Sequence, residues 1–101
     1  MRSLALEGNQ LTSVKGLEKF TKLVELDLRN NQLTDVKGLE KLTQLKNLFL
    51  GGNQLTDVKS LEKLTQLTEL GLHNNPDLTK AQIAELQKAL PNCKILHNVE
   101  R

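Results

Sequence analysis

Leucine and asparagine recur along this chain with a fixed period of 22 residues. The stretch over 31–45 reads NQLTDVKGLEKLTQL, and it returns over 53–67 with only Gly38 exchanged for Ser60. A looser copy lies over 9–23, and the asparagines that mark the period are Asn9, Asn31, Asn53 and Asn75. Self-similarity at a period of this length is typical of a solenoid, in which each repeat stacks on the next.

Each repeat predicts a short strand followed by a helical return. In the first half, leucine alternates with other residues, as at Leu26 and Leu28, which indicates a strand with one buried face. In the second half, apolar residues recur every three positions, which suits a single turn of 3₁₀ helix. We expect the polar residue before each valine to cap these turns. These residues are Ser13, Asp35 and Asp57.

The asparagine is the one polar residue inside this apolar frame. Its side chain is therefore expected to be buried, and a buried amide must be hydrogen-bonded, here to backbone groups of the turn. Stacked repeats would place the four asparagines in a structural ladder with the spacing between strands, about 4.8 Å.

The pattern changes after position 78. Thr79 and Gln82 have the spacing of a capping box, and Ile83, Leu86 and Leu90 follow at helical spacing until Pro91. The leucine frame then resumes and predicts a fifth strand, in which Cys93 takes a leucine position and is read as a small buried apolar residue. We therefore expect repeats over 1–78, about four in number, and a C-terminal cap over 79–101.

The frame LxxLxLxxNxL followed by xxVxxLxxLxx resembles the leucine-rich repeat family, and the short returns are similar to those of bacterial internalin-like repeats. The resemblance covers almost the whole chain. It implies an α/β fold: a right-handed curved solenoid with about five short parallel strands on the concave side and short 3₁₀ or helical turns on the convex side. It also implies a non-catalytic role in binding proteins.

Variation between repeats is concentrated at strand positions that face away from the leucines, whereas the second halves are almost copied. Phe49 lies between Leu48 and Leu50, so a regular strand exposes it, and we expect it to anchor a protein or peptide partner beside a hollow left by nearby glycines. Acidic neighbours favour a basic or amide-rich partner. The predicted partner-binding residues are Glu25, Asp27, Arg29, Asn47, Phe49, Glu69 and His73.

An alternative hypothesis concerns the first strand, which follows no capping unit. Its uncapped edge could pair with a second copy of the chain and make a homo-oligomer. In this interpretation the chain is a truncated, duplicated or designed building block. The edge residues are Met1, Ser3, Leu4, Ala5 and Leu6.

Charge and motifs exclude most other functions. The net charge is +2, and lysine and glutamate alternate closely, so no basic block indicates nucleic acid. We expect the lysine and glutamate columns of the convex side to be solvated and mutually neutralising. No catalytic constellation, metal-ligand set or cofactor motif is present, so we expect no enzyme activity, cofactor or metal. No signal peptide or transmembrane segment is predicted, and the sequence does not indicate a compartment.

Overall fold

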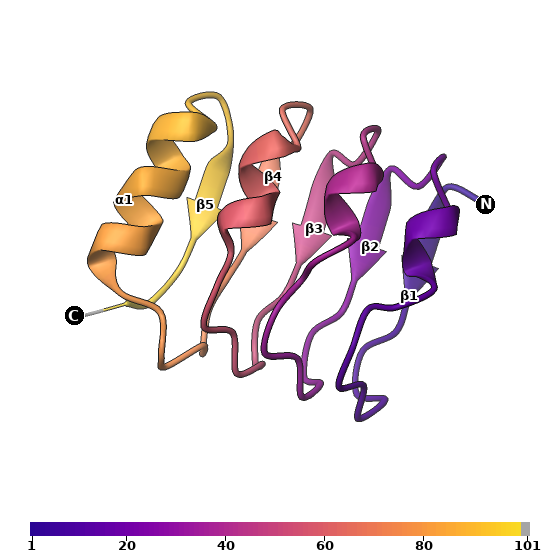
Figure 1. Cartoon of the computed structure of the whole chain (residues 1–101), viewed down its shortest axis with the longest axis horizontal. Helices are drawn as coiled ribbons and strands as arrows, with labels where there is room; N and C mark the ends of the chain where they lie inside the picture. Colours follow the sequence, from indigo (N-terminus) through magenta and orange to yellow (C-terminus); the bar gives the residue numbers. More distant parts are fainter. Residues whose placement is uncertain (100–101) are drawn as a thin grey trace.

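The computed structural model describes residues 1–99, in which the sequence repeat becomes a stack of coils (Figure 1). One strand from each coil enters a single parallel sheet, in the order β1-β2-β3-β4-β5. The strands are β1 (Ser3–Ala5), β2 (Glu25–Asp27), β3 (Asn47–Phe49), β4 (Glu69–Gly71) and β5 (Lys94–Leu96). This architecture confirms the predicted solenoid, with the sheet on the concave side and the turns on the convex side.

The register of the sheet follows the sequence period. Leu4 aligns with Leu26, then with Leu48 and Leu70, each 22 residues further on. The last step is longer, because Leu70 aligns with Ile95 across the inserted helix. Equivalent positions of all repeats therefore form straight rows across the sheet.

A second layer of short helices packs over the other side of the strands (Figure 1). It contains the 3₁₀ turns η1 (Leu17–Lys19), η2 (Leu39–Lys41) and η3 (Lys59–Lys63), followed by the α-helix α1 (Lys80–Ala89). The predicted capping box is confirmed, since the Thr79 hydroxyl accepts from the Gln82 N–H at 3.2 Å and the Gln82 amide oxygen accepts from the Thr79 N–H at 2.9 Å. The fifth strand and the buried Cys93 are also confirmed.

The core lies between these two layers and is almost entirely leucine. Leu26, Leu48 and Leu70 of the strands are completely buried, as are Leu39 and Leu61 of the turns. Each fully buried leucine contributes about 1.5–3 kcal/mol relative to an exposed one. Repetition of this one contact across coils explains how a chain with only two aromatic residues builds a continuous core.

The prediction that Ser13 and Asp35 cap the 3₁₀ turns is wrong. The residues that directly precede the turns are Gly16, Gly38 and Val58, and no side chain of theirs makes a capping hydrogen bond. Ser13 and Asp35 accept from the N–H two residues later, before η1 and η2 begin, whereas Asp57 accepts from the N–H of Lys59, the first residue of η3. These distances are 3.0 Å for Ser13–Lys15, 3.1 Å for Asp35–Lys37 and 2.9 Å for Asp57–Lys59.

The asparagine ladder forms as predicted at three of its four positions. The Asn53 side chain accepts from the Leu33 N–H at 3.0 Å and donates to the carbonyls of Leu28 at 3.0 Å and Leu50 at 2.9 Å. It therefore joins its own repeat to the preceding one, and Asn31 and Asn75 do the same. Asn9 departs from the prediction. Among residues 1–99 no coil stacks on the outer side of the first one, so the Asn9 side chain is exposed there, and its amide donates to the Glu7 carbonyl at 3.3 Å.

Candidate binding face

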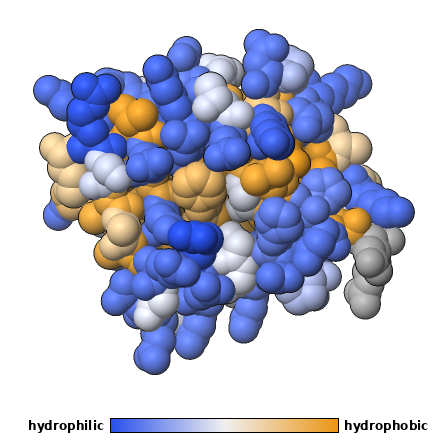
Figure 2. All heavy atoms as spheres, turned by 180° about the vertical axis from the view of Figure 1, so that it is seen from behind, coloured by the Kyte–Doolittle hydropathy of each residue, from blue (hydrophilic) through white to orange (hydrophobic). Residues whose placement is uncertain are grey.

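The solvent-facing side of the sheet, here called the concave face, carries all seven residues predicted to bind a partner. They alternate along β2, β3 and β4 with leucines that are buried beneath the sheet, and none of the seven belongs to the core. Figure 2 shows hydrophilic side chains on both sides of a band of apolar surface across this face.

At the carboxyl end of β2, the charged side chains of Asp27, Arg29 and Glu7 interact with one another. The Arg29 guanidinium donates to both carboxylate oxygens of Asp27, from Nε at 3.0 Å and from Nη2 at 2.8 Å, and Nη2 lies 3.5 Å from Glu7. The hydrogen bonds from the Arg29 side chain, and a further one from its backbone N–H, lower the pKa of Asp27. The Asp27 carboxylate is therefore ionised, and the positive charge of Arg29 compensates its negative charge on this face.

Phe49 is half-buried, whereas a regular strand was expected to expose it. The Arg29 guanidinium carbon lies 5.9 Å from the centre of the ring, close enough for a cation–π contact on that side. On the other side the ring leans over Gly71, where an added Cβ would lie 3.4 Å from Phe49 Cδ1. The glycine of β4 therefore receives the ring, and Phe49 is held in one place with part of its surface open.

Two hollows lie on either side of Phe49, and its ring forms a wall of both. The first has a volume of about 280 Å³ and lies over β1 and β2, between Ser3, Glu25 and Asp27. The second has a volume of about 370 Å³ and lies at the carboxyl ends of β3 and β4. Its lining residues are Arg29, Asn30, Phe49, Gly51, Gly52, Gly71, His73, Asn74 and Leu96. The predicted hollow beside the glycines is therefore present.

The sequence interpretation missed a row of residues with positive φ, three of which line the second hollow. The residue before each ladder asparagine has a positive φ: 72° at Gly8, 58° at Asn30, 74° at Gly52 and 58° at Asn74. Glycine and asparagine are the residues that adopt this conformation most readily, so their recurrence at this position was the available signal. At Gly52 space is also limiting, since a Cβ there would lie 2.1 Å from the Asn30 amide oxygen.

The residues of the predicted self-association edge lie together at the N-terminal end of the stack. Within residues 1–99, β1 has a strand partner on one side only, namely β2. The Met1 side chain is 64% exposed, and Leu4 and Leu6 are half-buried.

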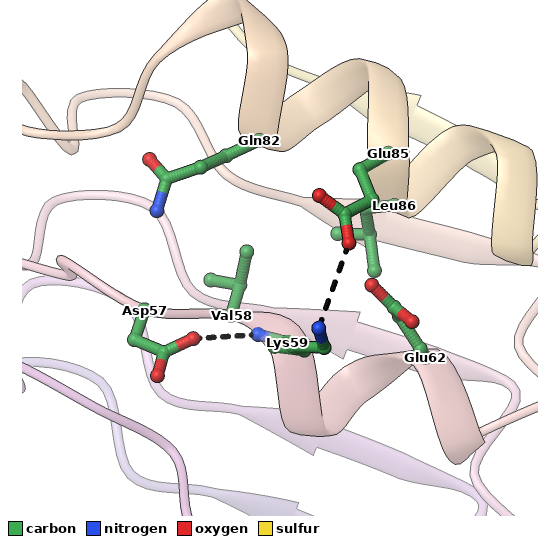
Figure 3. A pocket seen from close by; sticks show the side chains of 7 residues that line it. All are labelled: Asp57, Val58, Lys59, Glu62, Gln82, Glu85 and Leu86. Carbon is green, nitrogen blue, oxygen red and sulfur yellow. Dashed lines mark hydrogen bonds and ion pairs between the residues drawn. The ribbon is translucent and has the colours of Figure 1, made fainter.

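On the convex side, a shallow groove of about 140 Å³ lies between η3 and α1 (Figure 3). The Lys59 ammonium points across it to the Glu85 carboxylate at 3.8 Å. Both side chains are largely exposed, so this pair contributes little stability.

Other titratable groups form no chemical site in the described part of the chain. No three histidine, cysteine or acidic side chains among residues 1–99 are grouped to hold a metal ion. Burial raises the pKa of the Cys93 thiol, which is the opposite of what a nucleophilic cysteine requires.

The geometry defines a class of protein: a repeat solenoid with an open sheet face and a helical convex side. A family model described as leucine-rich repeats in two copies matches residues 1–41 and 43–88. The chain therefore belongs to the leucine-rich repeat family. Families of this kind are typically non-enzymatic scaffolds that bind proteins.

Three solved structures share this fold closely. An internalin (InlF) from Listeria monocytogenes matches all of this chain with 30% identity and a TM-score of 0.89. Internalin C2 from the same organism matches 98% of it with 25% identity and a TM-score of 0.79. A leucine-rich repeat protein from Leptospira interrogans matches 94% of it with 34% identity and a TM-score of 0.84. A search of curated proteins finds no match.

The chain spans 30%, 44% and 25% of the lengths of these three structures, in the same order. It is thus similar to one segment of each internalin and of the Leptospira protein. Within residues 1–99, no helix has the length and apolar character needed to cross a membrane.

Proposed function

We propose that the chain is a protein-binding module whose concave face contacts a partner around Phe49. The observation that carries the proposal is the position of this ring. It stands on the middle strand, is fixed by Arg29 on one side and Gly71 on the other, and forms a wall of both hollows. A fixed aromatic side chain loses little conformational entropy on binding, which makes it a suitable anchor.

The two hollows offer different chemistry to a partner. Glu25 lines the first hollow together with Asp27, which Arg29 neutralises. Among residues 1–99, the hydrogen bond that the Glu25 carboxylate accepts comes from the Ser3 hydroxyl, at 3.2 Å. This end of the face therefore suits a basic or amide-bearing group. Within the described part of the chain, residues 1–99, no carboxylate lines the second hollow.

The proposal is tested by selecting peptides from a random displayed library against the intact chain and measuring their affinity for Phe49→Ala. Removal of the ring should weaken selected peptides by about fivefold or more, equivalent to about 1 kcal/mol. Lys37→Ala is the matched control, because Lys37 is exposed on the convex side and should leave affinity within twofold. Circular dichroism establishes that both variants are folded.

Selected peptides that bind Phe49→Ala as well as the parent chain, but lose affinity for Lys37→Ala, would place binding on the convex side and remove the proposal. Chemical-shift mapping supplies a second readout. Shifts should group on residues of β2, β3 and β4 and leave η1 and η2 unchanged.

The second candidate function is self-association through the β1 edge. It is favoured by one observation: Leu4, Leu6, Leu11 and Leu17 of the first coil are only half-buried, and Met1 is exposed. Pairing of two such edges would cover this apolar end and continue the sheet. Sedimentation velocity tests it. A monomer at high micromolar concentration contradicts the idea, whereas a dimer that Leu6→Lys dissociates supports it.

A further inference from the structure

We propose that the second hollow recognises a carboxylate of the bound partner, through the backbone N–H groups of Gly51 and His73. This inference rests on the proposed function of the concave face and adds the chemistry of the group that the face selects. It concerns the strand position seventh in each repeat, which is occupied by Glu7, Arg29, Gly51 and His73.

The chain itself shows how a carboxylate occupies this position. In the second repeat the Asp27 side chain turns back and accepts from the Arg29 N–H at 3.1 Å. Asp27 thus supplies an acceptor for the Arg29 N–H, which among residues 1–99 makes no hydrogen bond to a neighbouring coil. The backbone N–H groups just before and just after it do bond to the next coil. The Leu28 N–H donates to Phe49, and the Asn30 N–H donates to Gly51, both at 2.8 Å.

The third and fourth repeats lack this internal acceptor. Phe49 and Gly71 align with Asp27 in the sheet, and neither side chain can accept a hydrogen bond. Among residues 1–99, the N–H groups of Gly51 and His73 accordingly have no hydrogen-bond acceptor. They lie in neighbouring coils, about 4.8 Å apart by the spacing of strands, and both residues line the second hollow.

The surroundings favour an anionic acceptor over a neutral one. Among residues 1–99, no acidic side chain lines the hollow. A carboxylate forms charge-assisted hydrogen bonds that are roughly twice as strong as neutral ones. At the edge of the hollow, the Asn30 amide nitrogen donates to Glu7 at 3.2 Å, and the Asn74 amide oxygen accepts from Asn98 at 2.8 Å.

Phe49 and Leu96 supply apolar surface on two sides of the same hollow. The group that fits is therefore a carboxylate with an apolar side chain next to it, as in an acidic residue beside leucine in an extended peptide. The hollow at the carboxyl ends of β3 and β4 would take this pair, while the hollow over β1 and β2 would face basic or amide groups.

The experiment uses two blocked peptides that differ by one group, Ac-Ala-Leu-Glu-Leu-Ala-NH₂ and its glutamine counterpart. Each is titrated into the ¹⁵N-labelled 101-residue chain at neutral pH, and the backbone amide resonances are followed. The glutamate peptide should move the Gly51 and His73 amides in a saturable way, at least threefold more than the glutamine peptide does. The Arg29 amide should move little, because Asp27 already occupies it.

A matched pair of variants tests the mechanism. Gly71→Asp places a carboxylate two residues before His73, as Asp27 stands before Arg29, and should reduce the glutamate-specific shifts at least fivefold. Gly71→Ala adds a Cβ in the same place without an acceptor and should retain the shifts within twofold.

Equal shifts from the two peptides, or no saturable shift from either, overturn the carboxylate assignment, as does equal loss in Gly71→Asp and Gly71→Ala. These results leave the proposed function intact if the library peptides still depend on Phe49. If instead library peptides ignore Phe49 while the glutamate-specific shifts persist, the hollow binds carboxylates and the proposed anchor is wrong.

Discussion

The second repeat (23–44) and the third repeat (45–66) have strands in the same register, but the side chains and N–H groups on their solvent-facing side differ in whether they are already bonded. In the second repeat, the Asp27 carboxylate accepts hydrogen bonds from the side chain and the backbone N–H of Arg29, so neither group is available to a partner. In the third, the aligned Phe49 and the nearby Gly51 leave a ring partly open and an N–H free in the described chain. The comparison shows that the inward leucines fix the coil, while the outward positions decide whether a coil is inert or able to bind.

The convex halves of the same two repeats differ by a single residue with a local structural consequence. Gly38 has a φ of 106°, and its N–H donates to the Glu40 carboxylate at 2.7 Å. Ser60 takes its place in the third repeat, where the 3₁₀ turn begins two residues earlier and extends over Lys59–Lys63. Since serine does not readily adopt the conformation of Gly38, the turn is built differently around it.

The largest expected effect comes from breaking what the two repeats have in common. Asn53→Ala removes the acceptor of the Leu33 N–H, which is left buried without a partner. It also removes one of the two donors to each of the Leu28 and Leu50 carbonyls, which keep their bonds from Asn31 and Asn75. An unpartnered buried group costs about 1–3 kcal/mol and each lost hydrogen bond about 0.5–1.5 kcal/mol, so the variant should lose about 2 kcal/mol of unfolding free energy or more. Because the chain has no tryptophan or tyrosine, urea unfolding is followed by far-ultraviolet circular dichroism.

Asn9→Ala is the control for this experiment. Asn9 occupies the same sequence position, but its side chain is exposed and donates to the Glu7 carbonyl at 3.3 Å, while its backbone N–H bond to Asn31 survives the substitution. Asn9→Ala should therefore change stability by less than about 0.5 kcal/mol. Equal losses in Asn9→Ala and Asn53→Ala would show that the ladder bonds between coils are not what stabilises the stack.

A smaller effect is expected from exchanging the one residue that separates the two convex halves. A side chain at the φ of Gly38 costs about 1–2 kcal/mol. Since the third repeat shows a turn that accommodates serine, Gly38→Ser should relax toward it and lose about 1 kcal/mol or less of unfolding free energy, measured in urea.

The accompanying loss of the Glu40 contact provides the check. Hydrogen bonds from its own backbone N–H and from that of Gly38 lower the pKa of Glu40 in the parent chain. Glu40→Gln should therefore be destabilising in the parent and neutral in the Gly38→Ser background. A loss of unfolding free energy above about 2 kcal/mol in Gly38→Ser, with Glu40→Gln still destabilising in that background, would mean that η2 does not adopt the conformation of η3.

Period and spacing were sufficient to predict the coils, the strand register and the capping box of α1, because these depend on where leucine, asparagine and threonine fall along the chain. The Asp27–Arg29 contact was missed because it depends on how two side chains fold back across a strand. The partial burial of Phe49 was missed for a similar reason, since it requires a neighbouring strand that presents a glycine. The free donors of Gly51 and His73 become visible only when the backbone hydrogen bonds are traced.

The smallest expected effect concerns the Asp27 carboxylate, which is paired with Arg29 in the second repeat. The Arg29 side chain lowers the pKa of Asp27, so its folded value lies below the value of about 3.9 in an unfolded chain. Stabilisation by the pair is therefore present above about pH 4 and is lost as the pH falls through the folded value. Asp27→Asn should destabilise the chain by less than about 1 kcal/mol at neutral pH, because Arg29 is half-exposed.

The difference between the parent chain and Asp27→Asn should shrink at pH values below the folded pKa of Asp27, where the parent carboxyl is also neutral. Urea unfolding of both proteins at about pH 7 and about pH 3 measures it. In an Arg29→Gln background the substitution should show little pH dependence, since the cation is absent. A difference that stays constant with pH would mean that Asp27 acts through its hydrogen bonds alone. A neutral asparagine amide would then accept the Arg29 N–H as well as the carboxylate does. By the same argument, a glutamine side chain of a partner would bind the Gly51 N–H of the third repeat as well as a glutamate side chain.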